Sequence, residues 1–154
     1  MDKHDFLAYA RRRFGAEPEN PFSGDFAGFI FRHGHNRKWF AIGMDVPRSK
    51  LGLEGEDTVP FVCLKCGPLL KGSFIDRPGI VPAWHCNKTN WIGVLLDGTA
   101  EEETILELLE ISYDLTNWIR KKNPEPVPNR RKNDSKKICR RRTKKLSRNI
   151  FCAS

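Results

Sequence analysis

The sequence lacks several features that would each indicate a particular class of protein. No run approaches the roughly 18 consecutive apolar residues of a transmembrane helix, and the first fourteen residues carry charges where a signal peptide has its apolar core. The five cysteines form no even disulfide framework, which excludes a disulfide-stapled secreted fold. No internal repeat is present. We therefore expect a cytoplasmic protein without a membrane span.

Motifs for catalysis and metal binding are also missing. Cys63 and Cys66 have the CxxC spacing of zinc and redox sites, but Cys86 and His85 supply no second tight pair, so structural thiols are favoured. His85 and Cys86 are neighbours on an expected strand and would face opposite sides, which argues against a Cys-His dyad. We expect no enzyme activity, no cofactor and no bound metal.

An excess of positive charge is absent from most of the chain, although the net charge of the 154 residues is +8. Residues 121–154 hold 13 Lys or Arg and only two acidic residues, a net charge of +11. The first 120 residues hold 14 basic and 17 acidic side chains, a net charge of −3. The composition thus divides the chain into a body, residues 1–121, and a basic tail, residues 122–154, which is expected to be disordered.

Hydrophobic periodicity and turn residues predict three helices and five strands in the body. The helices are expected over residues 3–14, 67–74 and 99–119. The strands are expected over residues 26–32, 38–44, 58–65, 80–86 and 90–97, the first two and the last two forming hairpins. Thr99 and Glu102 have the spacing of a capping box, and Pro60 favours an edge position, or the start, for the third strand. The expected class is α+β, an antiparallel sheet packed against N- and C-terminal helices.

Basic, amide and aromatic side chains gather at the two hairpin turns, an arrangement that can bind nucleic acid. The histidines of the first turn, His33 and His35, are interpreted as exposed turn residues. The tail cations would neutralise phosphates and release counterions. The candidate nucleic-acid-binding residues are Arg37, Lys38, Asn87, Lys88, Asn90 and Trp91 of the hairpins and Arg130, Arg131, Lys132, Arg140, Arg141, Arg142, Lys144 and Lys145 of the tail.

A second interpretation gives the body a role in binding another protein or a small anionic ligand. Two cations, an imidazole, an amide and an indole could together line a pocket for an anion. These residues are Arg48, Lys50, His85, Asn87 and Trp91. A third, a metal site on the acidic residues 101–110, ranks last because helix capping and solvation explain those carboxylates.

Several stretches resemble the MmcQ/YjbR family of small bacterial proteins. They are "NRKWFAIGMDVPRSKLGL", "LKCGP", "RPGIVPAWHCNKTNWIGVLLDG" and "ILELLEISYDLT", in order within the body. The most specific parts are the His-x-Asn-Lys-x-x-Trp run from His85 to Trp91 and the Ser112-Tyr113 pair. The resemblance implies a fold similar to CyaY and frataxin and DNA binding through a double wing, whose wings would be His33–Lys38 and Asn87–Asn90. We expect a monomer with DNA or another nucleic acid as partner.

Overall fold

The computed structural model describes residues 1–21 and 28–118. The expected disorder of the tail and its candidate residues, from Arg130 to Lys145, lie outside the described residues. The elements follow one another as α1 (Lys3–Phe14), β1 (Phe29–Arg32), β2 (Trp39–Pro47), the 3-10 turn η1 (Arg48–Leu51), β3 (Thr58–Lys65), α2 (Gly67–Phe74), β4 (Ile80–Pro82), β5 (Trp91–Leu95) and α3 (Glu102–Thr116).

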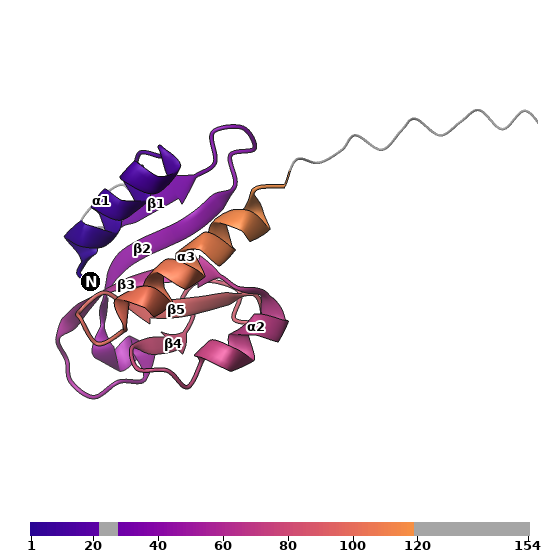
Figure 1. Ribbon diagram of the computed structural model, residues 1–154. Coiled ribbons are helices and arrows are strands. Elements are labelled where there is room, and N and C mark those ends of the chain that lie inside the picture. Colours follow the sequence, from indigo (N-terminus) through magenta and orange to yellow (C-terminus); the bar gives the residue numbers. More distant parts are fainter. Residues whose placement is uncertain (22–27, 119–154) are drawn as a thin grey trace, which may run out of the picture. The chain divides into compact units, whose positions relative to one another are not determined.

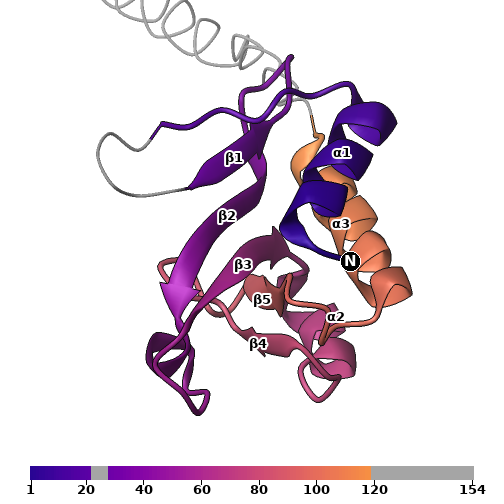
Figure 2. The same ribbon diagram turned by 90° about the vertical axis from the view of Figure 1, so that its left-hand side faces the viewer.

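The strands form one antiparallel sheet in the order β1-β2-β3-β5-β4. The two predicted hairpins are the outer pairs, β1 with β2 and β4 with β5, and β3 joins them in the centre. Helices α1 and α3 lie side by side on one face of the sheet (Figures 1 and 2). The predicted α+β class, with N- and C-terminal helices on an antiparallel sheet, is confirmed.

Helix α1 has the bounds that its sequence predicts because both ends carry local capping signals. The Asp2 carboxylate accepts a hydrogen bond of 2.8 Å from the N–H of Asp5 at the first turn. At the other end Gly15 has a φ of 60° and donates its N–H to the carbonyl of Arg11. Helix α2 and strand β3 also have the predicted bounds.

The sheet buries apolar side chains on both of its faces, as β3 shows. Val62 and Leu64 belong to the core between the sheet and the helices, whereas Phe61 and Cys63 belong to a cluster on the other face. This division follows from the alternation of side chains along a strand. Leu51 of η1 also packs in the second cluster. The central strand is therefore shielded from water on both sides.

Two strand glycines are needed because aromatic rings lie against the backbone there. A Cβ at Gly43 would overlap the ring of Phe29, which pairs with Gly43 across β1 and β2. A Cβ at Gly93 would overlap the ring of Phe61. Gly93, which leaves β5 without a side chain at that point, therefore makes room for a buried ring of the core.

Pro60 lies on the central strand, so the predicted edge position is wrong, but it is the third residue of β3, near the start of the strand as the other alternative has it. The Pro60 carbonyl accepts a hydrogen bond of 2.8 Å from the N–H of Leu96, which places the backbone polar groups of Pro60 on the β5 side. Strand β5 ends at Leu95. Because Pro60 has no N–H to donate back to Leu96, only one of the two bonds of this pair forms, at the point where β5 ends.

The last helix is shorter at both ends than predicted. It spans Glu102–Thr116, and its N-cap residue, Glu101, makes no side-chain capping bond, so the predicted capping box at Thr99 is wrong. Thr99 instead donates its N–H to Oδ1 of Asp97 at 3.0 Å, which closes a local turn before the helix. The acidic first turn is present and faces the positive end of the helix dipole.

The loop between β4 and β5 is longer than the predicted three-residue turn. Trp84 and His85 lie in this loop and not on a strand, because β4 ends at Pro82. His85 has a φ of 58°, a left-handed conformation that cannot continue a strand. Its ring is exposed, and its centroid lies 3.7 Å from that of Trp84.

Candidate nucleic-acid interface

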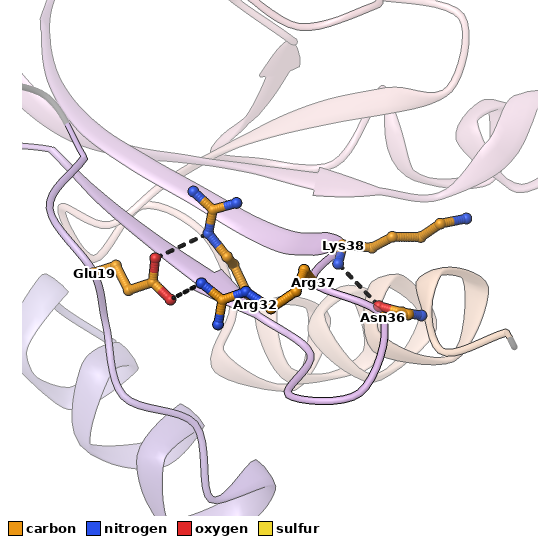
Figure 3. Close-up of polar contacts among 5 residues, drawn as sticks. All are labelled: Glu19, Arg32, Asn36, Arg37 and Lys38. Carbon is orange, nitrogen blue, oxygen red and sulfur yellow. Dashed lines mark hydrogen bonds and ion pairs between the residues drawn. The ribbon is translucent and has the colours of Figure 1, made fainter.

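The tip of the first hairpin, residues 33–38, is fastened to the C-terminal end of α3 by Asn36. Its Nδ2 donates to the carbonyls of Thr116, at 2.8 Å, and Trp118, at 3.1 Å, while its Oδ1 accepts from the N–H of Lys38 (Figure 3). Carbonyls at a helix end have no partner within the helix, so Asn36 acts as a cap from a distant element. The first predicted wing is therefore a fixed part of the domain.

The cations of this tip already have partners. Arg37 donates to Oε1 of Glu19 at 3.0 Å, and Arg32 lies 3.0 Å from the other oxygen of the same carboxylate (Figure 3). The Lys38 ammonium lies 3.3 Å from the ring centroid of Trp118, a cation–π contact. Two arginines share one carboxylate, so the tip keeps an excess of positive charge. Glu19, which the sequence did not single out, determines how large that excess is.

His33 is buried, with 3% of its surface exposed, so its interpretation as an exposed turn residue is wrong. Its Nε2 lies 2.7 Å from Oγ1 of Thr116, whose hydroxyl donates to the carbonyl of Ser112 at 2.7 Å. Because the Thr116 proton is used there, Nε2 of His33 carries the proton of the bond between them. Burial, and to a smaller extent the neighbouring His35, lowers the pKa of His33, while the Tyr113 carbonyl acts in the opposite direction.

The lowered pKa of His33 predicts that the domain loses stability on mild acidification. The unfolded chain binds a proton near pH 6.5, whereas the folded protein does so only at lower pH, so the stabilisation is complete above about pH 6.5 and is lost below it. The slope reaches at most about 1.4 kcal/mol per pH unit. Urea unfolding across this range should give a flatter profile for His33→Gln than for the wild type. The exposed His4→Gln should keep the wild-type profile, and parallel curves for His33→Gln would contradict the assignment.

The asparagines of the second tip hold its turn together. Oδ1 of Asn87 accepts from the N–H of Thr89 at 2.8 Å, and its carbonyl accepts from the N–H groups of Asn90 and Trp91. The Asn90 carbonyl in turn accepts from the backbone N–H groups that begin α2. Neither asparagine needs a ligand to explain it. Trp91 is partly buried and packs against the second apolar cluster.

Lys88 is the exposed cation of the second tip, and a lysine from another element lies beside it. The ammonium of Lys71, on α2, donates a hydrogen bond to the backbone carbonyl of Lys88. The structure thus brings two lysines together at this corner. Lys71 was not selected from the sequence. It lies on α2, 17 residues before Lys88, and only the packing of α2 against the second hairpin brings the two lysines together.

The five residues of the alternative pocket are divided between two ends of β5. Arg48 lies beyond the C-terminal end of this strand, where it pairs with Asp97 at 2.9 Å, and Lys50 follows it on η1. Trp91 begins the strand at the opposite end, where it pairs with Lys65. A strand rises about 3.3 Å per residue, so Arg48 and Trp91 lie too far apart to contact one small ligand.

The Cys63 thiol, on β3, donates to the Trp84 carbonyl at 3.5 Å in the loop that also carries Cys86. A hydrogen bond with Cys86 and burial raise the pKa of Cys63, and the same bond lowers the pKa of Cys86. Cys66 is buried, which raises the pKa of its thiol. Among residues 1–21 and 28–118, no three His, Cys, Asp or Glu side chains form a group that could hold a metal ion.

These pKa directions predict different reactivity of the thiols, since the thiolate is the nucleophile. Cys86, which is partly exposed, should react with iodoacetamide at least about tenfold faster than Cys63 or Cys66 in the native protein. Peptide mapping by mass spectrometry separates the three sites, and unfolding in urea serves as the control in which the rates converge. Equal native rates would show that the pair does not form.

Helices that could cross a bilayer are absent from the described part of the chain. The family model described as YjbR matches residues 12–115. YyaQ of Bacillus subtilis is 30% identical over 116 residues, which cover 75% of this chain and 98% of YyaQ.

Two solved structures are similar in fold to this chain. A Pseudomonas syringae protein solved by crystallography is 40% identical with a TM-score of 0.72, and the match covers 75% of this chain and 99% of that one. The Deinococcus radiodurans protein DR2400 is 20% identical with a TM-score of 0.55 over 83% of this chain and 93% of that one, a likeness of fold alone. With the family model matching most of the body, the chain belongs to the YjbR family.

Proposed function

We propose that this YjbR-family protein is a non-enzymatic protein that binds nucleic acid mainly through its basic tail, residues 122–154. The observation that carries the proposal is the net charge of +11 on residues 121–154, against −3 on the preceding residues. Lysines and arginines that neutralise phosphates release condensed counterions, which gives binding that is strong at low salt and independent of sequence. The family model ends at residue 115, so this segment is an addition to the domain.

The point at which the segment begins supports a contribution from the first hairpin tip. Trp118, the last described residue, is held by the Asn36 amide and lies under the Lys38 ammonium. The basic segment is therefore covalently tethered within a few residues of Arg37 and Lys38. Phosphate contacts made by the tip cations would add to those made by the tail.

The folded domain contributes less than the segment because its tip cations are partly neutralised. Glu19 shares its charge between Arg32 and Arg37, and the second tip offers Lys88 with Lys71 beside it. Few free cations and an overall negative domain give a weak attraction for phosphate. In this proposal the hairpin tips of the domain add secondary contacts to phosphate.

Fluorescence anisotropy with labelled duplex and single-stranded DNA tests the proposal, using the full chain and residues 1–121 in a salt series. The full chain should bind both forms with a steep salt dependence, and the shortened chain should bind at least about 100-fold more weakly with a nearly flat one. The shortened chain corresponds to the solved Pseudomonas syringae protein, 99% of which is covered by the match, so residues 1–121 should fold without the tail. If residues 1–121 bound DNA with the full affinity, the proposal would be wrong, and the hairpin tips would be the binding site.

A further inference from the structure

A cavity of about 280 Å³ opens beside the first hairpin tip, between the end of α1, the end of β1 and α3. Aromatic rings and charged groups line it together: Phe14, Glu19, Arg32, His33, Arg37 and Tyr113. The rings of Phe14 and Tyr113 stack at 4.2 Å between centroids and form an apolar wall. Liquid water takes about 30 Å³ per molecule, so the space equals about nine waters and suits a very small organic molecule.

Two buried polar atoms on residues of the cavity wall have no hydrogen-bond partner within the described residues. The first is Nδ1 of His33, which is left as a bare acceptor because Nε2 carries the proton toward Thr116. The second is Nε of Arg32, a donor that lies 3.0 Å from Glu19 but whose N–H does not point at the carboxylate oxygen. An unpaired buried acceptor or donor costs about 1–3 kcal/mol, so native structures keep few of them.

The charges around the cavity leave room for an anion. Glu17 is paired with Arg11 at 3.1 Å on the outer side, and Glu19 alone faces both Arg32 and Arg37. The cavity wall therefore carries two guanidinium groups and two carboxylates, and one of these carboxylates, Glu17, is already engaged by Arg11. A guanidinium group has five N–H donors, of which one carboxylate can engage only a part, so both arginines keep donors for a second carboxylate.

We propose that this cavity binds a small carboxylate that also carries a hydroxyl or ammonium group, of the hydroxy-acid or amino-acid class. Its carboxylate lies on Arg32 and Arg37, and its O–H or N–H donates to Nδ1 of His33. The donor is required because His33 presents an acceptor, and the anion is required because the arginines present donors. Both orphaned atoms are shielded from solvent, so the proposal requires the side chain of Arg32 to move aside when the ligand enters.

Glu19 has a definite part in this site, because its carboxylate occupies donors that the ligand needs. Its charge competes with the ligand for Arg37, which it meets at 3.0 Å. Removing that charge should therefore strengthen binding, whereas removing the Arg37 charge should weaken it. Effects of Glu19 and Arg37 that a distant ion pair does not share distinguish a shaped site from a general attraction for anions. The site does not depend on nucleic-acid binding by the tail.

The test uses full-length protein with glycerate, lactate and serine as probes and propionate as the probe that lacks a donor. Calorimetry gives the affinities, and long-range nitrogen correlation spectra report Nδ1 of His33. Glycerate, lactate or serine should move the Nδ1 resonance of His33 and leave that of His4 unmoved. Propionate should bind about tenfold more weakly, the effect of one lost hydrogen bond to a charged or buried partner.

Substitutions give the second half of the test. Glu19→Gln should strengthen binding about tenfold and Arg37→Gln should weaken it about tenfold. The controls are Asp97→Asn and Arg48→Gln, which change the same charges in the ion pair at the far corner of the domain and should leave affinity unchanged. An unmoved Nδ1 resonance with all three donor-bearing probes, or equal effects of Glu19→Gln and Asp97→Asn, would overturn the proposal.

Discussion

Glutamine in place of five cations of the tail lowers the affinity of the full-length protein for duplex DNA by about 100-fold or more at physiological salt. The positions are Arg140, Arg141, Arg142, Lys144 and Lys145. Each phosphate contact contributes about 0.9 to the slope of log affinity against log salt, so the slope should decrease by up to about 4.5. Because the mechanism is counterion release, the loss should be largest at low salt and should not depend on base sequence.

A matched control separates charge from other properties of the same segment. Alanine at five neutral positions, Asn133, Ser135, Thr143, Ser147 and Asn149, changes as many side chains without changing the charge. Anisotropy should give this variant the wild-type affinity and slope. If the glutamine variant kept the wild-type slope, the phosphate contacts would have to lie on the domain, with Lys71 and Lys88 as the next residues to substitute.

Elements whose signals are local could be predicted from the sequence almost to the residue. Asp2 and Gly15 cap the first helix from positions next to its ends. Pro and Gly residues mark the limits of the segments 58–65 and 67–74, which are β3 and α2 in the structure. The same reasoning failed at the start of α3, because the spacing of Thr99 and Glu102 is only a necessary condition for a capping box. The Thr99 N–H is bonded to the Asp97 carboxylate in a turn, and the helix begins only at Glu102.

The site depended on partners that no local pattern reveals. Asn36 caps a helix 80 residues further along the chain, and Glu19 meets Arg37 from a loop 18 residues earlier. A turn sequence with histidines and cations looks exposed, yet His33 is buried because α3 passes over it and Thr116 offers it a hydrogen bond. These contacts form only when the elements pack together. The cavity beside the tip therefore could not be predicted from the sequence.

Ser112 provides the clearest case of a residue whose role appears only in the packed structure. The β2–β3 pairing ends at Ala41 with Leu64, and the next pair along the ladder would join Phe40 to Lys65. The Ser112 hydroxyl lies between them. It donates to the Phe40 carbonyl at 2.5 Å and accepts from the Lys65 N–H at 2.8 Å. One side chain of α3 thus ties the helix to two strands of the sheet.

Ser112→Ala should lower the free energy of unfolding by about 2–4 kcal/mol, because a fully buried hydroxyl leaves two backbone groups without a partner. Urea unfolding measures the loss, and hydrogen exchange should show faster exchange of the Lys65 amide. Ser73→Ala is the control, since this serine is exposed on α2 and its substitution should change stability by less than about 0.5 kcal/mol.

A small effect of Ser112→Ala would have one specific physical meaning. The Phe40 carbonyl and the Lys65 N–H would then pair directly and extend the β2–β3 ladder by one bond, which would protect the Lys65 amide from exchange instead of exposing it. Closing the ladder would require β2 and β3 to approach each other under α3, beside the buried His33 and its bond to Thr116. The exchange rate of one amide therefore decides whether Ser112 holds the strands apart or only fills a gap between them.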